Sequence, residues 1–177
     1  PLVESGVVVR EAGIVCDAKS GVSGAGRKPS LKTSFCEVTD NFSVYSVFNH
    51  RHVPEVLRTS GLQNGELSFT AQLLPIDRGI LETIYAMLTP GVDEPAVAAA
   101  LQSAYADSPF VRLTGRDLPE IKHVAHTNFC DIGWRVNPGT RQLVLISCID
   151  NLVKGAAGQA VQNFNVAFGF DERLGLN

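Results

Sequence analysis

The sequence predicts an α+β domain with a mixed, mainly antiparallel sheet and helices on one face. Strand-like runs follow one another without regular strand–helix alternation, which is not typical of a parallel α/β fold. Residues 137–140, Asn-Pro-Gly-Thr, lie between two such runs and favour a hairpin turn. Helical spacing of apolar residues is confined to a few segments. The uncovered face of such a sheet needs a cover, which a second subunit would supply.

Composition narrows the class of protein. The 177 residues are 45% hydrophobic and 19% charged, which excludes a disordered or collagen-like chain and is consistent with one domain over residues 1–177. No apolar stretch approaches the roughly 20 residues of a membrane span. A formal charge of −3 disfavours nucleic acid or an anionic membrane as the main partner.

The first half of the chain contains two strand signals and one helix signal. Residues 14–18 and 44–48 are rich in β-branched and aromatic side chains, and a glycine-rich loop, residues 20–29, follows the first run. Pro54 and Glu55 suit the first turn of a short helix that ends at Gly61.

The second half contains more strands and two longer helices. The expected strands are residues 67–74, 79–88, 110–113, 129–136 and 142–149. Asp93 is expected to cap a helix that reaches Tyr105. A last helix, opened by Asp150 and Asn151, has an apolar stripe for a neighbouring helix or a bound cofactor: Val153, Ala157, Ala160, Phe164 and Phe168.

The four cysteines do not form a Cys-x-x-Cys pair. They are Cys16, Cys36, Cys130 and Cys148, each placed in or beside a strand-like run. Without a signal peptide we expect buried free thiols in a reducing compartment.

The glycine-rich loop does not match the known nucleotide-binding motifs. Gly21-x-x-Gly24-x-Gly26 reverses the spacing of a dinucleotide fingerprint, and the loop lacks the Gly-Lys-Ser/Thr of a P-loop. Two interpretations remain open: a tight turn, or a backbone nest for an anion.

Polar residues elsewhere offer further candidates for chemistry. The histidines fall in two groups, His50 with His52 and His123 with His126, compatible with a metal site, structural roles or acid/base work. Arg78 is either a surface residue or a clamp for a carboxylate or phosphate. Asp131, within an apolar run, is expected to make a structural hydrogen bond.

Five segments occur together in one order. They are residues 17–27 (DAKSGVSGAGR), 50–55 (HRHVPE), 74–81 (LPIDRGIL), 128–133 (NFCDIG) and 150–163 (DNLVKGAAGQAVQN). In these segments the chain resembles the N-acetyl-γ-glutamyl-phosphate reductases of arginine biosynthesis. The resemblance spans essentially the whole chain, and five ordered motifs are far more specific than one.

The resemblance implies a fold and a reaction. Enzymes of this family have an N-terminal Rossmann domain that binds NADPH and a C-terminal domain like that of glyceraldehyde-3-phosphate dehydrogenase. A cysteine thiolate displaces phosphate from the acyl phosphate, and hydride from NADPH reduces the resulting thioester to N-acetylglutamate semialdehyde. The chain would then be the substrate-binding and dimerisation domain of a homodimer or homotetramer, in the cytoplasm or, in a plant, the plastid stroma.

The nucleophile of the family has no counterpart here. It lies in a Gly-Cys-Tyr/Phe-Pro-Thr segment that this sequence lacks. The resemblance therefore implies that the Rossmann domain and the catalytic cysteine lie outside this chain. Pro1 would fall within the helix after that cysteine, and we expect the isolated chain to be inactive.

The resemblance also implies roles for nine residues and assigns none to a metal. His50 would be the acid/base, with His52 as the alternative and Glu55 orienting it. The residues that hold the substrate's carboxylate and phosphate would be Ser23, Arg27 and Arg78. The residues that face the nicotinamide end of NADPH would be Ser20, Gly21 and Asn151.

Two positions depart from the family pattern. Gln72 stands where the family often has His, so it would form hydrogen bonds without transferring protons. His126 stands where the family often has Gly, so we assign it no role. Three alternatives stay open: a lysine-pathway aminoadipyl-phosphate reductase domain, a non-catalytic dimerisation module, and a metal hydrolase built on the histidine pairs.

Overall fold

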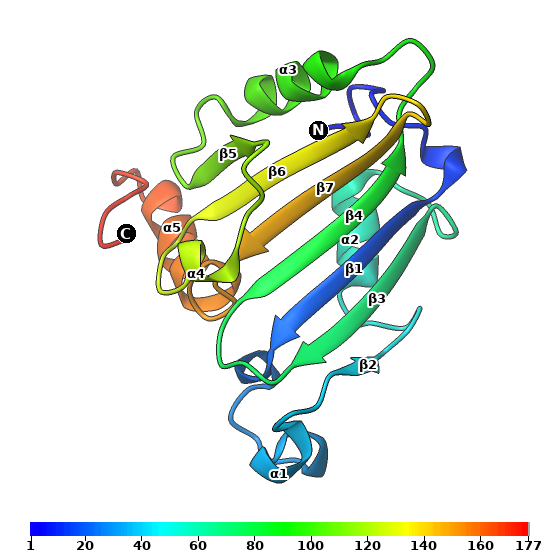
Figure 1. Ribbon diagram of the computed structural model, residues 1–177. Coiled ribbons are helices and arrows are strands. Elements are labelled where there is room, and N and C mark those ends of the chain that lie inside the picture. Colours follow the sequence, from blue (N-terminus) through cyan, green and yellow to red (C-terminus); the bar gives the residue numbers. More distant parts are fainter. Residues whose placement is uncertain (177) are drawn as a thin grey trace.

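A computed structural model describes residues 1–176 (Figure 1). The strands are β1 (Ile14–Gly21), β2 (Ser43–Tyr45), β3 (Leu67–Leu74), β4 (Ile80–Met87), β5 (Val111–Gly115), β6 (Cys130–Asn137) and β7 (Gln142–Ile149). The α-helices are α1 (Phe35–Val38), α2 (Val53–Ser60), α3 (Glu94–Tyr105), α4 (Ile121–Val124) and α5 (Gly158–Ala167).

All strands belong to one seven-stranded sheet with the order β2-β3-β1-β4-β7-β6-β5. The pairs β1–β3 and β5–β6 are parallel, and the other four neighbouring pairs are antiparallel. The α+β class and the mixed, mainly antiparallel sheet are therefore confirmed.

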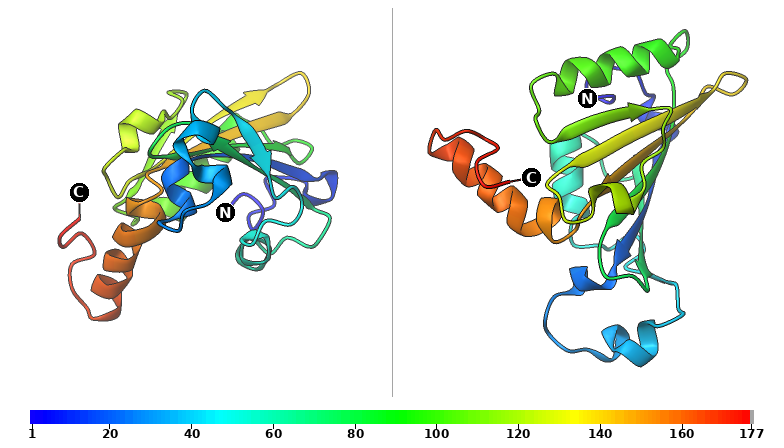
Figure 2. Two further views of the ribbon diagram at one scale, coloured as in Figure 1. Left: turned by 90° about the horizontal axis from the view of Figure 1, so that it is seen from below. Right: turned by 60° about the vertical axis from the view of Figure 1, so that its left-hand side comes forward.

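The sheet has two faces of different character. Side chains alternate along each strand, so residues paired across the strands share a face. Cys16, Ile84 and Leu145 mark the inner face, whereas Val15, Tyr85 and Val144 mark the outer face. Helices α2 and α3 and the N-terminal residues lie on the inner side (Figures 1 and 2).

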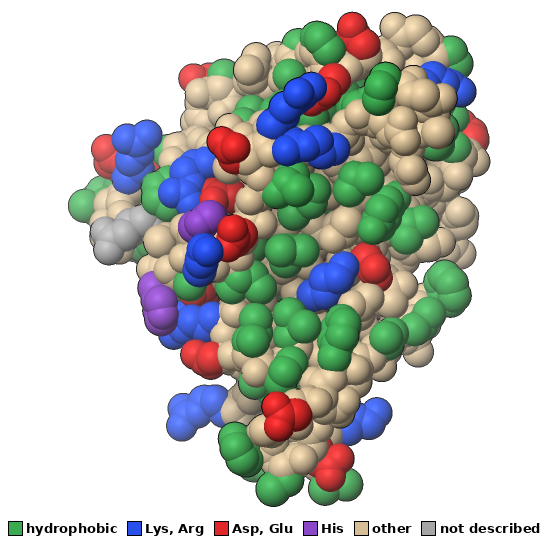
Figure 3. Space-filling model, in the orientation of Figure 1, with side chains coloured by type: hydrophobic (Ala, Val, Ile, Leu, Met, Phe, Trp, Pro, Cys, Tyr) green, Lys and Arg blue, Asp and Glu red, His purple; other side chains and the backbone are tan. Residues whose placement is uncertain are grey.

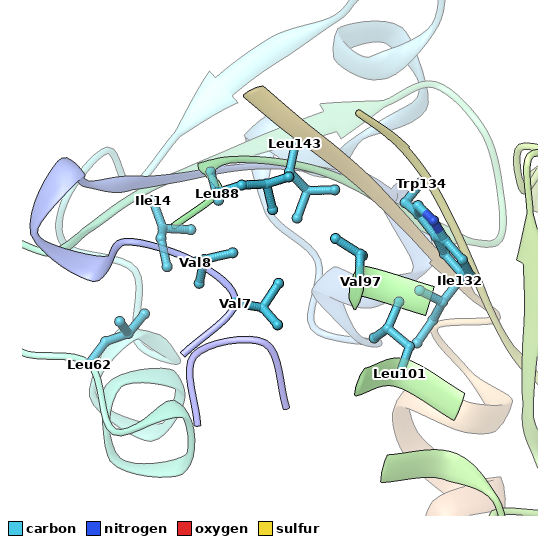
Figure 4. Packing of buried hydrophobic residues seen from close by; sticks show 11 residues of the cluster. Val7, Val8, Ile14, Leu62, Leu88, Val97, Leu101, Ile132, Trp134 and Leu143 are labelled. Carbon is cyan, nitrogen blue, oxygen red and sulfur yellow. The ribbon is translucent and has the colours of Figure 1, made fainter. Parts of the chain in front are cut away.

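The main core lies between the inner face and these segments. Its buried members, shown in Figure 4, are Val7, Val8, Ile14, Leu62, Ala86, Leu88, Val97, Leu101, Ile132, Trp134 and Leu143. Val97 and Leu101 attach α3, and each fully buried side chain of this kind contributes about 1.5–3 kcal/mol. Packing therefore stabilises α3 more than its intrinsic helix propensity does.

Local signals placed the ends of α2 and α3 correctly. The N–H of Ala96 donates to Asp93 Oδ1 at 3.1 Å, which confirms the predicted cap of α3. Gly61 ends α2 with a left-handed φ of 71°, as a glycine after a helix often does. The predicted hairpin is also present, because Arg141 N–H donates to Asn137 O at 2.8 Å.

Two boundaries near the first strand were wrong. The expected strand over residues 44–48 is only β2, because Ser46 and Phe48 adopt positive φ angles of 50° and 59°, which a strand does not accommodate. β1 continues to Gly21, so part of the expected loop 20–29 is strand, and a 3-10 turn (Val22–Ala25) follows.

The last helix begins as predicted, but its apolar stripe faces away from the rest of the chain. Leu152 and Val153 donate their N–H groups to Asp150 Oδ1 at 2.7 and 2.9 Å, and a π-helical turn (Val153–Ala157) precedes α5. The expected apolar stripe is largely exposed, with Phe164 52% and Phe168 68% accessible. Gly158 and Asn165 are buried instead, so the polar side of α5 faces the rest of the chain.

The outer face is mostly open. Figure 3 shows hydrophobic side chains across it, whereas α4 and the segment before it cover the part over β6 and β7, where Asp131 and Cys148 are buried. Between the exposed Val15 and Val44 lies a polar group in which Gln72 Nε2 donates to Asp17 Oδ1 at 2.6 Å and Lys19 lies 3.5 Å from Asp17. Gln72 therefore points away from the inner face.

The cysteines and Asp131 mostly behave as expected. All four thiols are free, but Cys36 is exposed on α1, so its predicted burial beside a strand was wrong. Asp131 is buried and accepts from Arg112 Nε at 2.6 Å, which confirms its structural hydrogen bond. Within residues 1–176, no helix combines the length and apolar character needed to cross a membrane.

The backbone of His126 generates a stability prediction. Its φ is 65°, a left-handed conformation that Gly adopts without steric cost, and its side chain is exposed. We expect His126→Gly to raise the free energy of unfolding by about 0.5–1 kcal/mol in urea titrations, because the N–H is retained. The neighbouring Ala125→Gly, at φ −55°, should instead lower it. Equal effects of both changes on the free energy of unfolding would contradict the left-handed backbone conformation of His126.

Candidate functional site

Five of the nine predicted site residues meet at one end of the sheet. β1 ends, β4 begins and β7 ends there, because Ile80 pairs with both Ser20 and Ile149. We call this place the junction. The predicted residues that it contains are Ser20, Gly21, Ser23, Arg78 and Asn151.

Asn151 ties the junction together through its side-chain amide. Gly79 N–H donates to Asn151 Oδ1 at 2.7 Å, and Asn151 Nδ2 donates to Ser23 Oγ at 2.9 Å. Ser23 Oγ in turn donates to Asp77 O at 2.5 Å. The loop after β1 is thereby held against the loop before β4.

Glycines allow these segments to approach closely. A Cβ on Gly21 would lie 2.7 Å from Asp77 O, which is closer than nonbonded atoms allow. A Cβ on Gly24 would lie 3.2 Å from Ser20 Oγ and 3.4 Å from Asn151 Nδ2. Gly24 therefore leaves a small open space beside these two polar atoms.

The buried carboxylate of Asp150 lies next to the junction and stabilises it through hydrogen bonds and an ion pair. It accepts N–H groups from Leu152, Val153 and His126, the last at 2.7 Å on Oδ2, and Arg78 lies 3.2 Å from the same oxygen. Burial by itself would raise the pKa of Asp150, but the three backbone hydrogen bonds and Arg78 together hold that pKa below its usual value. The carboxylate is therefore charged and fully paired.

Arg78 has two carboxylate neighbours. Besides Asp150, Asp77 lies 3.6 Å from Arg78 Nε, and its side chain is largely exposed. The Arg78 side chain itself is about a quarter accessible, at 27%. The guanidinium is thus fixed in position, and part of its edge faces solvent.

His50 lies apart from the junction, on the inner side of the sheet. Its ring is 5.7 Å from Tyr45, 5.1 Å from His52 and 5.2 Å from Phe69, between ring centroids. Burial, followed by the positive charges of His52 and Arg51, lowers the pKa of His50 below 6.5. From Phe69 to Leu74, which pairs with Gly21, β3 rises about 17 Å at about 3.3 Å per residue.

Of the remaining predicted residues, His52 lies beside His50, whereas Glu55 and Arg27 join neither group. His52, Glu55 and Arg27 are exposed. Within residues 1–176, Glu55 makes no hydrogen bond or ion pair with His50, and Arg27 makes none with the junction. The proposed orienting role of Glu55 has no contact to support it here.

A cavity of about 1070 Å³ opens on the inner side, and no sequence pattern indicated it. Its lining includes Glu55, Phe69, Cys16, Glu82 and Ser147. Burial raises the pKa of the Glu82 carboxyl. Since Phe69 contacts His50, the cavity reaches the histidine's surroundings.

The histidine pairs do not form a metal site. Among residues 1–176, no three His, Cys, Asp or Glu side chains are grouped as metal ligands would be. His126 contributes its backbone N–H to Asp150, and Arg112 donates to the carbonyl oxygen of His123. The alternative of a metal hydrolase on these histidines therefore has no ligand set among the described residues.

Sequence reasoning missed the importance of Asp150, which it treated only as the start of a helix. Its partners Arg78 and His126 lie 72 and 24 residues away, so no local pattern marks them. An acidic residue directly after a buried strand and before Asn151 was the available signal.

We expect Asp150→Asn to lower the free energy of unfolding by about 2–4 kcal/mol, because an amide places N–H against one of the donors that the carboxylate accepts. Urea unfolding followed by circular dichroism measures this. Asp77→Asn is the matched control, since its exposed carboxylate also faces Arg78; it should change stability by less than about 0.5 kcal/mol. Similar losses in both variants would contradict a special role for Asp150.

Comparison with known proteins agrees with the fold and the motifs. Residues 1–151 match the family model described as semialdehyde dehydrogenase, dimerisation domain. N-acetyl-gamma-glutamyl-phosphate reductases of Desulforapulum autotrophicum and Caldicellulosiruptor bescii are 51% and 48% identical to the chain, over 99% of its length and 52% of theirs. The chain thus spans about half the length of these relatives.

Solved structures share the fold at lower identity. Aspartate semialdehyde dehydrogenase II from Vibrio cholerae superposes with a TM-score of 0.68 at 18% identity, over 96% of this chain and 60% of that one. A probable aspartate-semialdehyde dehydrogenase from Pseudomonas aeruginosa gives a TM-score of 0.69 at 18% identity, over 95% of this chain and 57% of that one. With the sheet and the family match in agreement, the chain belongs to the semialdehyde dehydrogenase dimerisation domain family.

Proposed function

We propose that this chain is the substrate-binding and dimer-forming part of an NADPH-dependent N-acetyl-γ-glutamyl-phosphate reductase of arginine biosynthesis, in the cytoplasm. One observation carries the proposal. Five residues expected to bind substrate and cofactor meet at the junction, in a chain about half identical to such reductases over nearly its whole length.

Substrate binding is assigned to Arg78 and Ser23. Arg27 is a further contact, provided that the loop after β1 moves it toward the junction. Asp150 holds one edge of the Arg78 guanidinium, which leaves its other N–H groups for a carboxylate or phosphate. Because the position of the cation is set before binding, little side-chain entropy is lost when the anion arrives.

The junction fits the nicotinamide end of NADPH, which supplies hydride when bound. Gly24 leaves free the space that a Cβ would occupy beside Ser20 Oγ and Asn151 Nδ2. Nδ2 keeps one N–H after bonding Ser23, so a carboxamide oxygen has a donor there. Gly21 would contact the cofactor through its backbone. A larger residue does not fit there, because its Cβ would lie 2.7 Å from Asp77 O.

Acid/base work is assigned to His50. Its lowered pKa keeps the ring neutral near pH 7, so it is able to accept a proton from a thiol and return it later to the hemiacetal oxygen. Nδ1 accepts a long hydrogen bond from His52 N–H at 3.4 Å, so in the neutral ring the proton lies on Nε2. For Nε2 to accept the thiol proton, the ring proton would move to Nδ1 and displace this weak hydrogen bond. His52 and Glu55, both exposed, would tune this ring.

The surfaces left open by the chain suit the assembly of a larger enzyme. The outer face carries the exposed side chains Val15, Val44 and Tyr85, and we assign it to a homodimer contact. The exposed aromatic rings of α5, together with the inner cavity, are assigned to the part of the longer reductase that this chain does not include.

Activity is tested by joining the chain to the complementary part of the Desulforapulum autotrophicum reductase. The chain alone should show no NADPH-dependent formation of semialdehyde, whereas the fusion should show it. His50→Asn in the fusion should lower kcat by about 100-fold or more, because general acid/base catalysis contributes about 10²–10⁴.

Two controls accompany this experiment. His52→Asn should lower kcat less than His50→Asn, and His123→Asn, an exposed histidine on α4, should leave it unchanged. An inactive fusion that is folded, or a fusion that reduces only the aminoadipyl phosphate, would contradict the assigned substrate.

The pKa of His50 is testable in the chain itself. The lowered value means that the unfolded chain binds this proton more tightly, so the stability contributed by neutral His50 is present above about pH 6.5 and lost as pH falls through the folded pKa. NMR titration of the ring should give a midpoint below 6.5, and His52→Gln should raise it. A midpoint at or above 6.5 would contradict the lowered pKa of His50.

A further inference from the structure

Residues 26–49 are referred to as the projecting loop, because the part before β2, with α1, projects beyond the end of the sheet (Figures 1 and 2). It leaves the sheet after β1 and returns through β2, carrying α1 near its tip. Within residues 26–49, Val38 alone is buried. The loop therefore has almost no core of its own.

Large apolar side chains on this loop are nonetheless exposed. Leu31, Phe35 and Phe48 are 80%, 81% and 74% accessible, and Phe42 and Val47 are also exposed. Phe48 adopts a positive φ of 59°, which is uncommon for a bulky residue and requires compensating contacts. Exposed apolar groups of this kind indicate an interaction surface.

We propose that the projecting loop of one protomer packs against a second copy of this chain and completes the dimer interface. The inference rests on the proposed homodimer through the outer face. The loop borders that face, because Val44 of β2 pairs with Gln72 and shares its outward direction. The family match for a dimerisation domain, residues 1–151, includes the whole loop.

The extent of the outer face supports a second contact area. The three open strands β3, β1 and β4 have eight residues each, whereas the outward-facing Ile146 and Cys148 of β7 are buried. At about 3.3 Å per residue and 4.8 Å between strands, these three strands cover about 380 Å² in plan. Stable interfaces of standard size bury about 800 Å² per partner. The projecting loop supplies apolar surface for the remainder.

Two-fold symmetry doubles the number of loop contacts in each dimer. In a two-fold pair each loop contacts the partner, so a substitution in the loop removes two contacts for each dimer. The charges of the loop are mixed: Arg27, Lys28 and Lys32 stand against Glu37 and Asp40, which leaves one formal positive charge. The loop therefore carries little net charge to oppose the contact.

Sedimentation of the chain over a dilution series tests the proposal. Leu31→Ser with Phe35→Ser should raise the dimer dissociation constant by about tenfold or more. The matched control is Val161→Ser with Val166→Ser on α5, also exposed apolar residues, which should change the constant less than about twofold. Circular dichroism shows that each variant is folded.

Cys36 provides a second readout without a loop substitution. It is exposed beside Phe35, whereas Cys16 and Cys148 are buried. Its alkylation by a maleimide should be slow in the wild-type dimer. It should become at least about fivefold faster on dilution to monomer, and also in the outer-face variant Val15→Asp with Tyr85→Asp.

Each outcome decides a separate question. A dimer whose dissociation constant is unchanged by the loop variant, with Cys36 equally reactive in dimer and monomer, overturns the loop contact and leaves the homodimer standing. A chain that stays monomeric at about 100 μM overturns both. Dissociation by the loop variant, with the outer-face variant still dimeric, supports the loop and contradicts the outer face.

Discussion

The buried carboxylate of Asp150 is the interaction on which the site depends. A charge removed from water costs several kcal/mol unless it is paired and hydrogen-bonded. Asp150 meets that requirement with donors from three separate segments: the start of the last helix, the turn at His126 and Arg78. These hydrogen bonds fix the position of Asp150 relative to the three segments. They also position the next residue, Asn151, whose Oδ1 accepts from Gly79 N–H.

The alternation of side chains along the strands separates the two proposed activities. His50 contacts Phe69 on the inner side, whereas Gln72, three residues later, bonds Asp17 on the outer side. A register shift of one residue would exchange the two faces completely. The acid/base work proposed for His50 and the dimer contact proposed for the outer face would therefore use opposite sides of one sheet.

Local signals explain which elements were predicted well. A side-chain cap at Asp93, a left-handed glycine at Gly61 and the hairpin turn at Asn137 act over only a few residues, so the residue types reveal them. β2 was predicted too long because the positive φ of Ser46 is not encoded by its residue type. The stripe on the last helix was identified correctly as apolar, but its spacing does not show what it faces.

Residue types and their order by themselves determined the fold class, most strands, the helix ends and the family to which the motifs point. Tertiary structure alone decided which of the nine predicted residues meet. Five gather at the junction, while His50 lies about 17 Å along β3 from its end. The reason is physical: these contacts join residues up to 128 positions apart, and they depend on strand order and register, which local patterns do not encode.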